Sequence, residues 1–163
     1  MLVANGDRMR HFAALAVLLP LLFLLASGCP QAQQEPASPQ VAPAATATMP
    51  DGTVISLEMA STKEQIIRGL SGREELCAEC GMLFVFSEPA PRGFWMRGMR
   101  FPLDIVFLDS NYTVLNMAEE VPPCAGECLV VHSQGPAKYV LEVNGGFARA
   151  HGLVANASLR VGA

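Results

Sequence analysis

The sequence predicts a mostly β fold with a minor α component, in the form of a compact β-sandwich or barrel-like single domain with one short helix. Apolar runs of strand length recur along residues 51–163, and the chain's 14 Gly and 12 Pro give frequent breaks between such runs. Only one segment has apolar residues at helical spacing. We see no alternation of strands with helices, which argues against dinucleotide-binding and flavodoxin-like folds.

The first half of this domain is expected to contain a strand, a helix and a second strand. Residues 53–60 alternate as a strand does. Residues 61–64, Ser-Thr-Lys-Glu, have the spacing of a capping box, so a short amphipathic helix should follow and end near Gly69 or Gly72. The apolar run at residues 82–86 predicts the next strand.

The centre of the chain carries a dense group of motifs between Phe94 and Asp109. Residues 94–97 are expected to form a short strand, and residues 103–108 a second one rich in Ile, Val and Phe. A turn signal follows at residues 109–112, which predicts a hairpin between residues 103–108 and residues 113–117.

Asp104 is the one charged residue inside that second strand, where both faces are otherwise apolar. Burying a carboxylate is costly unless a cation or several N–H groups meet it. We therefore expect an internal pairing with a basic side chain, and a ligand-facing acid is the alternative. The candidate partners are Arg68, Arg73, Arg97, Arg100 and Lys138.

The last part of the domain is expected to be a strand followed by irregular structure. Residues 138–143 alternate, which places Glu142 on the same side as Val140. Residues 147–151 form at most a helical turn after a Gly-rich break, and residues 158–161 are expected to close an edge strand.

The N-terminus has the pattern of an export signal. Arg8 and Arg10 precede an apolar run at residues 12–26, which ends in small residues before Cys29. This end resembles a bacterial lipobox, which implies cleavage after residue 28 and lipid attachment to Cys29. Lipid attachment would place the domain in the cell envelope, on the extracytoplasmic side. A secreted chain without lipid and an uncleaved anchor are the alternatives, and all three place the folded part outside the cytoplasm.

Residues 29–50 are expected to be the lipidated Cys and a Pro-, Ala- and Gln-rich tether, since such a segment buries too little to fold. Pro30 follows Cys29 where an Asp could retain a lipoprotein at the inner membrane, so the outer membrane, facing the periplasm, is favoured in a two-membrane cell. Without residues 1–28 the net charge is −5. This acidic balance argues against a nucleic-acid partner and leaves membrane attachment to the lipid.

Four further cysteines form a CxxC and a CxxxC motif: Cys77, Cys80, Cys124 and Cys128. Outside the cytoplasm an even number of loop cysteines favours disulfides, and local pairing is expected over cross-pairing. A zinc site is an alternative, as is Cu(I) handling that involves Met96 and Met99. A redox pair is disfavoured, because Cys80 leads into a strand and not into a helix N-terminus.

Polar side chains recur inside the apolar motifs, and we interpret them as a cleft that binds a small ligand or an envelope protein partner. This interpretation requires no cofactor and no resident metal. The alternative is a small hydrolase or isomerase that uses Asp104, Glu142 and His151 as acid and base. The six candidate ligand-binding residues are Trp95, Arg97, Asp104, Lys138, Glu142 and His151.

Several of these motifs, in one order, resemble those of the domain-of-unknown-function 192 family. The resemblance implies a small, β-rich, often exported domain whose activity is unassigned. Family members often have Asn-Thr where this chain has Gly98-Met99, and Ala where it has Gly145. The matching segments are residues 69–73 (GLSGR), 81–86 (GMLFVF), 94–97 (FWMR), 101–107 (FPLDIVF), 136–144 (PAKYVLEVN), 146–147 (GF) and 151–152 (HG).

Overall fold

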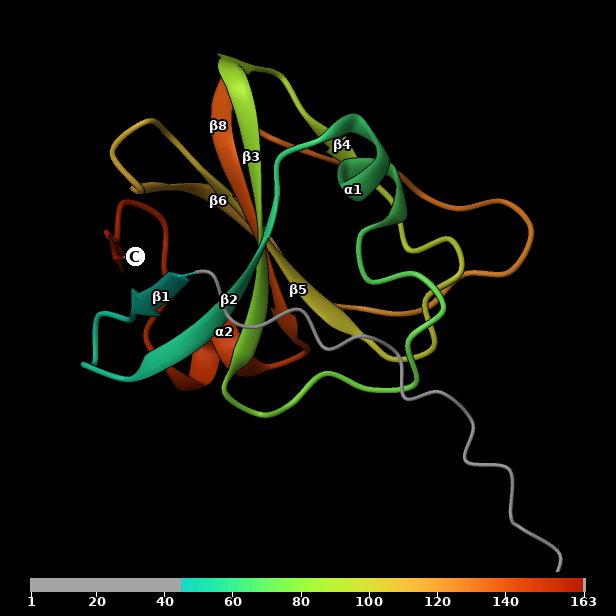
Figure 1. Cartoon of the computed structure of the whole chain (residues 1–163), viewed down its shortest axis with the longest axis horizontal. Coiled ribbons are helices and arrows are strands. Elements are labelled where there is room, and N and C mark those ends of the chain that lie inside the picture. Colours follow the sequence, from blue (N-terminus) through green and yellow to red (C-terminus); the bar gives the residue numbers. More distant parts are fainter. Residues whose placement is uncertain (1–44, 163) are drawn as a thin grey trace, which may run out of the picture. The chain divides into compact units, whose positions relative to one another are not determined.

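The computed structural model describes residues 45–162 and confirms a mostly β fold (Figure 1). Cys29, the export signal and most of the predicted tether lie outside the described residues. The elements are β1 (Ala45–Thr48), β2 (Val54–Ala60), α1 (Lys63–Arg68), β3 (Cys80–Ala90), β4 (Gly93–Phe94), β5 (Leu103–Leu108), β6 (Val114–Val121), β7 (Val131–His132), β8 (Ala137–Asn144), α2 (Phe147–Ala150) and β9 (Arg160–Gly162).

Seven strands form one sheet in the order β6-β5-β8-β3-β2-β1-β9, and β4 pairs with β7 in a second, two-stranded sheet. The large sheet is not closed into a barrel, so the barrel-like form of the prediction does not apply. The predicted hairpin is confirmed, because β5 pairs antiparallel with β6. The second helix, α2, is a single turn at the place where the sequence predicts at most a helical turn.

One strand–helix–strand crossover is present, although the sequence predicted none. Strands β2 and β3 are parallel neighbours, in register from Ser56 opposite Cys80 to Ala60 opposite Phe84. Parallel neighbours need a long connection, and here it contains α1 and the loop that follows. The sequence predicted the strand, the helix and the second strand in this order, but not that the two strands pair, because pairing depends on long-range contacts.

The folded region begins earlier than residue 51, where the sequence analysis placed its boundary. Ala45–Thr48 forms β1 in the stretch predicted to be tether, and β1 pairs with both β2 and β9. Small residues dominate β1, which is why it lacked a strand signal. Ala45 and Ala47 are nevertheless buried in the core.

The large sheet is covered on both faces, because successive residues of a strand point to opposite sides. On one face, Val106 and Leu141 lie in a core with Phe147 of α2. On the other, Phe107 and Val140 lie in a core with Leu70, just after α1. Every residue of β5 is buried, as expected for a central strand with two apolar faces.

Helix α1 begins with a capping box that lies one residue later than predicted. The N-cap is Thr62 and not Ser61: its hydroxyl accepts from the N–H of Gln65 at 3.3 Å, and Gln65 Oε1 accepts from the N–H of Thr62 at 3.0 Å. The helix ends at Gly69, one of the two predicted ends, where φ is +49°. That backbone conformation favours glycine.

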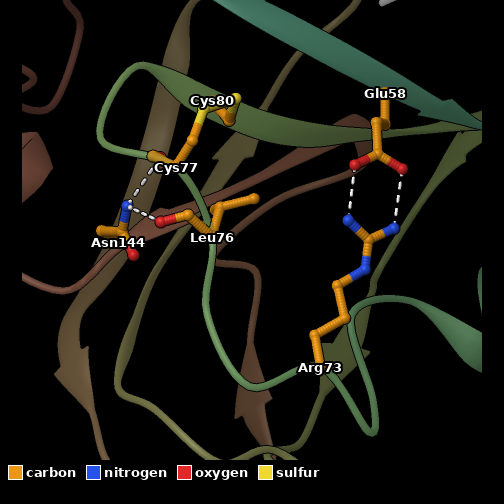
Figure 2. The surroundings of a disulfide bond; sticks show 6 residues. All are labelled: Glu58, Arg73, Leu76, Cys77, Cys80 and Asn144. Atoms are coloured by element: carbon orange, nitrogen blue, oxygen red, sulfur yellow. Dashed lines mark hydrogen bonds and ion pairs between the residues drawn. A yellow bond between two sulfur atoms is a disulfide. The ribbon is translucent and has the colours of Figure 1, made fainter. Parts of the chain in front are cut away.

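The cysteines pair locally, as predicted, in Cys77–Cys80 and Cys124–Cys128. Figure 2 shows the Cys77–Cys80 disulfide in the loop between α1 and β3. Asn144 donates to the carbonyls of Leu76 and Cys77, at 3.1 and 3.0 Å. Because these four thiols are used in disulfides, they are not available as zinc ligands.

The same loop is held by an ion pair with two hydrogen bonds. Both terminal nitrogens of Arg73 donate to the carboxylate of Glu58 on β2, at 2.5 and 2.7 Å (Figure 2). Arg73 is therefore committed to this contact and does not meet Asp104. The ion pair fixes the start of the loop against β2, directly after the segment that contains Gly69.

Candidate functional site

Glu142 lies in the middle of β8 and is almost fully buried, with 5% of its surface exposed. Its neighbours across the sheet are Met82 on β3 and Ile105 on β5. Neither can pair with a carboxyl group. The alternation of β8 thus places an acid on an apolar face, beside Val140, as the sequence pattern predicts.

The carboxyl group of Glu142 has an unsatisfied oxygen. Oε2 is buried and has no hydrogen-bond partner among residues 45–162. Burial raises the pKa of Glu142 from its ordinary value of 4.5 to about 8, because removal of water disfavours the charged form. At neutral pH the group therefore carries its proton, and it can both donate and accept a hydrogen bond.

A hollow of about 380 Å³ opens beside this carboxyl group. The end of α1 and the segment around β4 lie next to one another (Figure 1), and residues of both line the hollow. Its size is near the lower end of small-molecule sites. It is lined by Ile66, Ile67, Arg68, Gly69, Leu70, Ser71, Phe84, Phe86, Pro91, Arg92, Gly93, Phe94, Trp95, Met99 and Glu142.

Aromatic rings form much of the lining. Phe94 meets Phe84 edge to face, with ring centroids 4.9 Å apart, and Phe86 in the same manner at 6.4 Å. Such pairs add about 1 kcal/mol each beyond the area they bury, so these three rings hold one another in place. Trp95 is 51% exposed and presents a large apolar surface to the opening.

Gly69 keeps the approach to Glu142 open. A Cβ atom at this position would lie 3.9 Å from Glu142 Oε2 and 3.3 Å from Cζ of Phe84. A larger side chain would therefore enter the space between the carboxyl group and the aromatic wall. Glycine serves both the end of α1 and the access to the acid.

Two guanidinium groups are the other charged groups in the lining. Arg92 lies over the ring of Phe86, with Cζ 3.8 Å from the ring centroid, and donates to the carbonyl of Glu88 at 2.6 Å. Arg68, in the last turn of α1, is exposed. Burial alone raises the pKa of Glu142, so neither cation stabilises its ionised form appreciably.

Asp104 is fully buried, but on the opposite face of the sheet from Glu142. It shares its face with Val106, which lies in the core that contains α2. Three backbone N–H groups donate to its carboxylate: those of Glu120 at 2.7 Å, Gly146 at 3.0 Å and Ala148 at 2.7 Å. The expected pairing with a basic side chain is wrong, because backbone N–H groups satisfy the carboxylate instead.

His151 lies near a different part of the surface. Its Nδ1 is 2.8 Å from a carboxylate oxygen of Asp51 and 3.1 Å from the hydroxyl of Thr53, and its ring lies 4.1 Å from that of Phe147. The pKa of Asp51 is lowered, chiefly by the N–H of Thr53 and then by His151. His151 thus joins the segment after α2 to the turn before β2.

The remaining two predicted residues, Arg97 and Lys138, do not line the hollow. The guanidinium carbon of Arg97 lies 4.4 Å from the centre of the Trp95 ring. Lys138 Nζ donates to the carbonyl of Ser87 at 2.5 Å. Of the six predicted residues, only Trp95 and Glu142 line the hollow, so the predicted single cleft is not formed.

The comparisons with known proteins agree with this fold. The family model DUF192, described as "Uncharacterized ACR", matches residues 45–161. The chain belongs to the DUF192 family. No curated protein gives a significant match.

Two solved structures resemble this DUF192 chain, each with a TM-score of 0.66. One is a protein of unknown function from Novosphingobium aromaticivorans DSM 12444, with 33% identity over 82% of this chain and 99% of that one. The other, from Sinorhizobium meliloti 1021, is described as a proposed transcription regulator and has 28% identity over 75% of this chain and 97% of that one.

One departure from the DUF192 motifs has a structural explanation. Gly98, where the resemblance gives Asn, has φ +75°, and its carbonyl accepts from the N–H of Gly72 at 2.9 Å. Glycine adopts this left-handed conformation freely, and Asn adopts it more readily than most residues. The departure therefore preserves the backbone conformation.

The acid–base and metal interpretations find little support in this geometry. Asp104, Glu142 and His151 do not share a site, because the first two lie on opposite faces and His151 contacts Asp51. Residues 45–162 contain no group of three or more His, Cys, Asp or Glu side chains suited to a metal ion. Met96 is 1% exposed within the core, which leaves only Met99 at the hollow.

Asp104→Asn is expected to lower the free energy of unfolding by roughly 3 kcal/mol. The amide has one acceptor oxygen for three N–H donors. Its NH₂ group cannot accept a hydrogen bond, so at least one backbone N–H loses its partner. Urea denaturation of the purified chain measures this change. Asp109→Asn, at a turn where Asn is also favoured, is the matched control and should cost less than about 1 kcal/mol. Equal effects of the two substitutions would contradict a special role for Asp104.

Glu142→Gln is expected to flatten the pH dependence of stability. Between about pH 4.5 and pH 8 the folded protein keeps the Glu142 proton and the unfolded chain does not. Stability from this group is therefore complete below pH 4.5 and decreases by about 1.4 kcal/mol for each pH unit up to about 8. From pH 5 to pH 8, the free energy of unfolding of the variant should rise by roughly 3 kcal/mol relative to that of the native chain.

The measurement is urea denaturation at several pH values, with Glu79→Gln as an exposed control. The unpaired amide of the variant can change its stability by an amount that does not depend on pH. Such a change leaves the slope of stability against pH unaltered. Parallel curves for Glu142→Gln and the native chain would show that the Glu142 carboxyl is already ionised in the folded state.

Proposed function

We propose that this chain is a lipid-anchored cell-envelope protein whose DUF192 domain binds a small organic molecule in the hollow beside Glu142. The supporting observation is the unpartnered, buried carboxyl group at an aromatic-lined hollow. An unpaired buried polar group lowers stability by roughly 1–3 kcal/mol. A protein that keeps such a group beside an open space is therefore expected to use it in its function. Binding of a ligand that forms the missing hydrogen bonds of the carboxyl group is such a function.

The aromatic lining supports the same proposal. Phe84, Phe86 and Phe94 form a wall in which the rings pack edge to face, and Trp95 is exposed at the opening. A preformed apolar wall with one polar group is the usual composition of a small-molecule site. The wall supplies affinity, and the carboxyl group supplies orientation.

The anchoring part of the proposal rests on the sequence around Cys29 and on the two disulfides. In residues 45–162 neither helix is long and apolar enough to cross a bilayer. Disulfides persist in oxidising compartments, which supports a location outside the cytoplasm. A lipid on Cys29 would hold the domain at the membrane through residues 30–44.

We do not propose a regulatory role for this chain, although its Sinorhizobium meliloti relative is described as a proposed transcription regulator. The acidic balance of the sequence, with 15 Asp and Glu against 11 Lys and Arg, disfavours contact with nucleic acid. A hydrolase or isomerase is not favoured either, because the three residues predicted for it do not meet.

Binding in the hollow is tested with a panel of small neutral, cationic and anionic aromatic compounds on the purified full-length chain. Trp95 is the only Trp in the sequence, so its fluorescence reports on the hollow directly. At least one compound class should change the emission in a saturable manner. By calorimetry, Trp95→Ala should weaken that binding about tenfold or more, because it removes one aromatic wall.

Val154→Ala is the control, since Val154 is also exposed but does not line the hollow. It should leave the affinity unchanged. A panel in which no class gives saturable binding, or binding that Trp95→Ala does not weaken, would refute the proposed site.

Lipid attachment is tested separately by Cys29→Ala. The native chain, expressed in a bacterium with lipoprotein processing, should fractionate with membranes and carry acyl groups by mass spectrometry. The Cys29→Ala chain should carry none. An acyl group on the variant, or a native chain that has no lipid and is cleaved elsewhere, would contradict lipid attachment at Cys29.

A further inference from the structure

We propose that the hollow binds an uncharged carboxamide head carried on an apolar body, with the head paired to the carboxyl group of Glu142. This inference rests on the proposed function, because it specifies the class of ligand for the same site. It follows from the hydrogen-bonding capacity of the acid, the charges at the hollow and the chemistry of the walls.

The first argument is complementarity with a protonated carboxyl group. A neutral carboxyl presents one O–H donor and one carbonyl acceptor side by side. A primary carboxamide presents an N–H donor and a carbonyl acceptor with the same spacing, so the two groups form a pair of hydrogen bonds. Because Oε2 of Glu142 has no partner among the described residues, both of these bonds would be new.

The second argument excludes an ammonium head. The charged groups in the lining besides Glu142 are Arg68 and Arg92, and both are cations. On the strands beside β8, the nearest cross-strand residues are Met82 and Ile105, which carry no charge. An ammonium would have to pass two guanidinium groups, lose its water and ionise an acid that burial keeps neutral.

The third argument excludes a carboxylate head at Glu142. A carboxylate only accepts hydrogen bonds, so it can use the O–H of Glu142 but leaves the carbonyl of that group unpaired. Its burial at Glu142 also costs several kcal/mol, because Arg68 and Arg92 do not stabilise a negative charge there appreciably. An anion would instead remain near exposed Arg68, away from the acid.

The fourth argument concerns the body of the ligand. Phe84, Phe86, Phe94 and Trp95 offer apolar surface on the way to the carboxyl group. The missing side chain at Gly69 leaves room between Phe84 and Glu142 Oε2. A flat or slender apolar group fits this path, with its polar head at the inner end.

Three probes of equal length test the head group: 3-phenylpropanamide, 3-phenylpropylamine and 3-phenylpropanoate. They are titrated into the purified full-length chain at about pH 6, where Glu142 is protonated, with Trp95 fluorescence and calorimetry as readouts. The amide is expected to bind at least about tenfold more tightly than the amine or the carboxylate. Its affinity should decrease as the pH rises through about 8.

Variants at Glu142 separate hydrogen bonding from charge. Glu142→Gln keeps a donor and an acceptor, so it should bind the amide within about threefold of the native chain and without the decrease near pH 8. Glu142→Leu removes both and should weaken amide binding about tenfold or more. Glu79→Gln, an exposed acid outside the hollow, should change neither affinity nor pH dependence.

The outcomes distinguish this inference from the proposed function. Tighter binding of the amine, or loss of amide binding in Glu142→Gln, would overturn the carboxamide class while the hollow remains a binding site. The same holds if other compounds of the wider panel bind and the amide does not. If neither these probes nor the panel bind, the proposed function itself fails.

Discussion

The arrangement of the C-terminal part depends on the hydrogen bonds that the carboxylate of Asp104 accepts from three backbone N–H groups. The donors belong to Glu120 on β6, Gly146 before α2 and Ala148 within α2, so one side chain joins a central strand, its hairpin partner and α2. The short helix has no side chain of its own at its N-terminus to cap it, and Asp104 takes that role from a different strand. A carboxylate suits three donors where an amide or hydroxyl would not, which explains a charge in an otherwise apolar strand.

Two acids on adjacent strands have opposite roles because of the alternation of side chains. Asp104 on β5 lies opposite Val143, and Ile105 lies opposite Glu142, so the two carboxyl groups face different cores. One core contains backbone N–H groups that meet the acid, and the other contains aromatic rings that do not. The same functional group is therefore ionised and fully hydrogen-bonded on one face, and protonated on the other, with one oxygen unpaired among the described residues.

The sequence predicted those parts of the molecule that local patterns determine. The Ile, Val and Phe content of residues 103–108 and the alternation of residues 138–143 predicted the central strands. The alternation also predicted that Glu142 shares a side with Val140, and the turn at residues 109–112 predicted the β5–β6 hairpin. Cysteine spacing gave both disulfides. The sequence did not reveal β1, whose small residues resemble a linker, or the parallel pairing of β2 with β3, which depends on long-range contacts. It also grouped six residues by motif density, whereas nothing in the sequence assigned Phe84, Phe86, Arg68 and Gly69 to one site with Glu142.

The loss of stability caused by burying the unpaired carboxyl group of Glu142 supports a functional role for this residue. Replacing a buried, unpaired carboxyl group by an apolar side chain of similar size generally stabilises a protein, and nothing in the neighbourhood of Met82 and Ile105 requires an acid for folding. Asp104 shows that this fold can satisfy a buried acid fully when the acid is structural. Among residues 45–162 Glu142 lacks such partners, and it lies where Gly69 leaves space and where aromatic rings pack against one another. Departures from local stability are expected at functional sites, and in the described part of this chain the contrast between these two acids supports the site proposed beside Glu142.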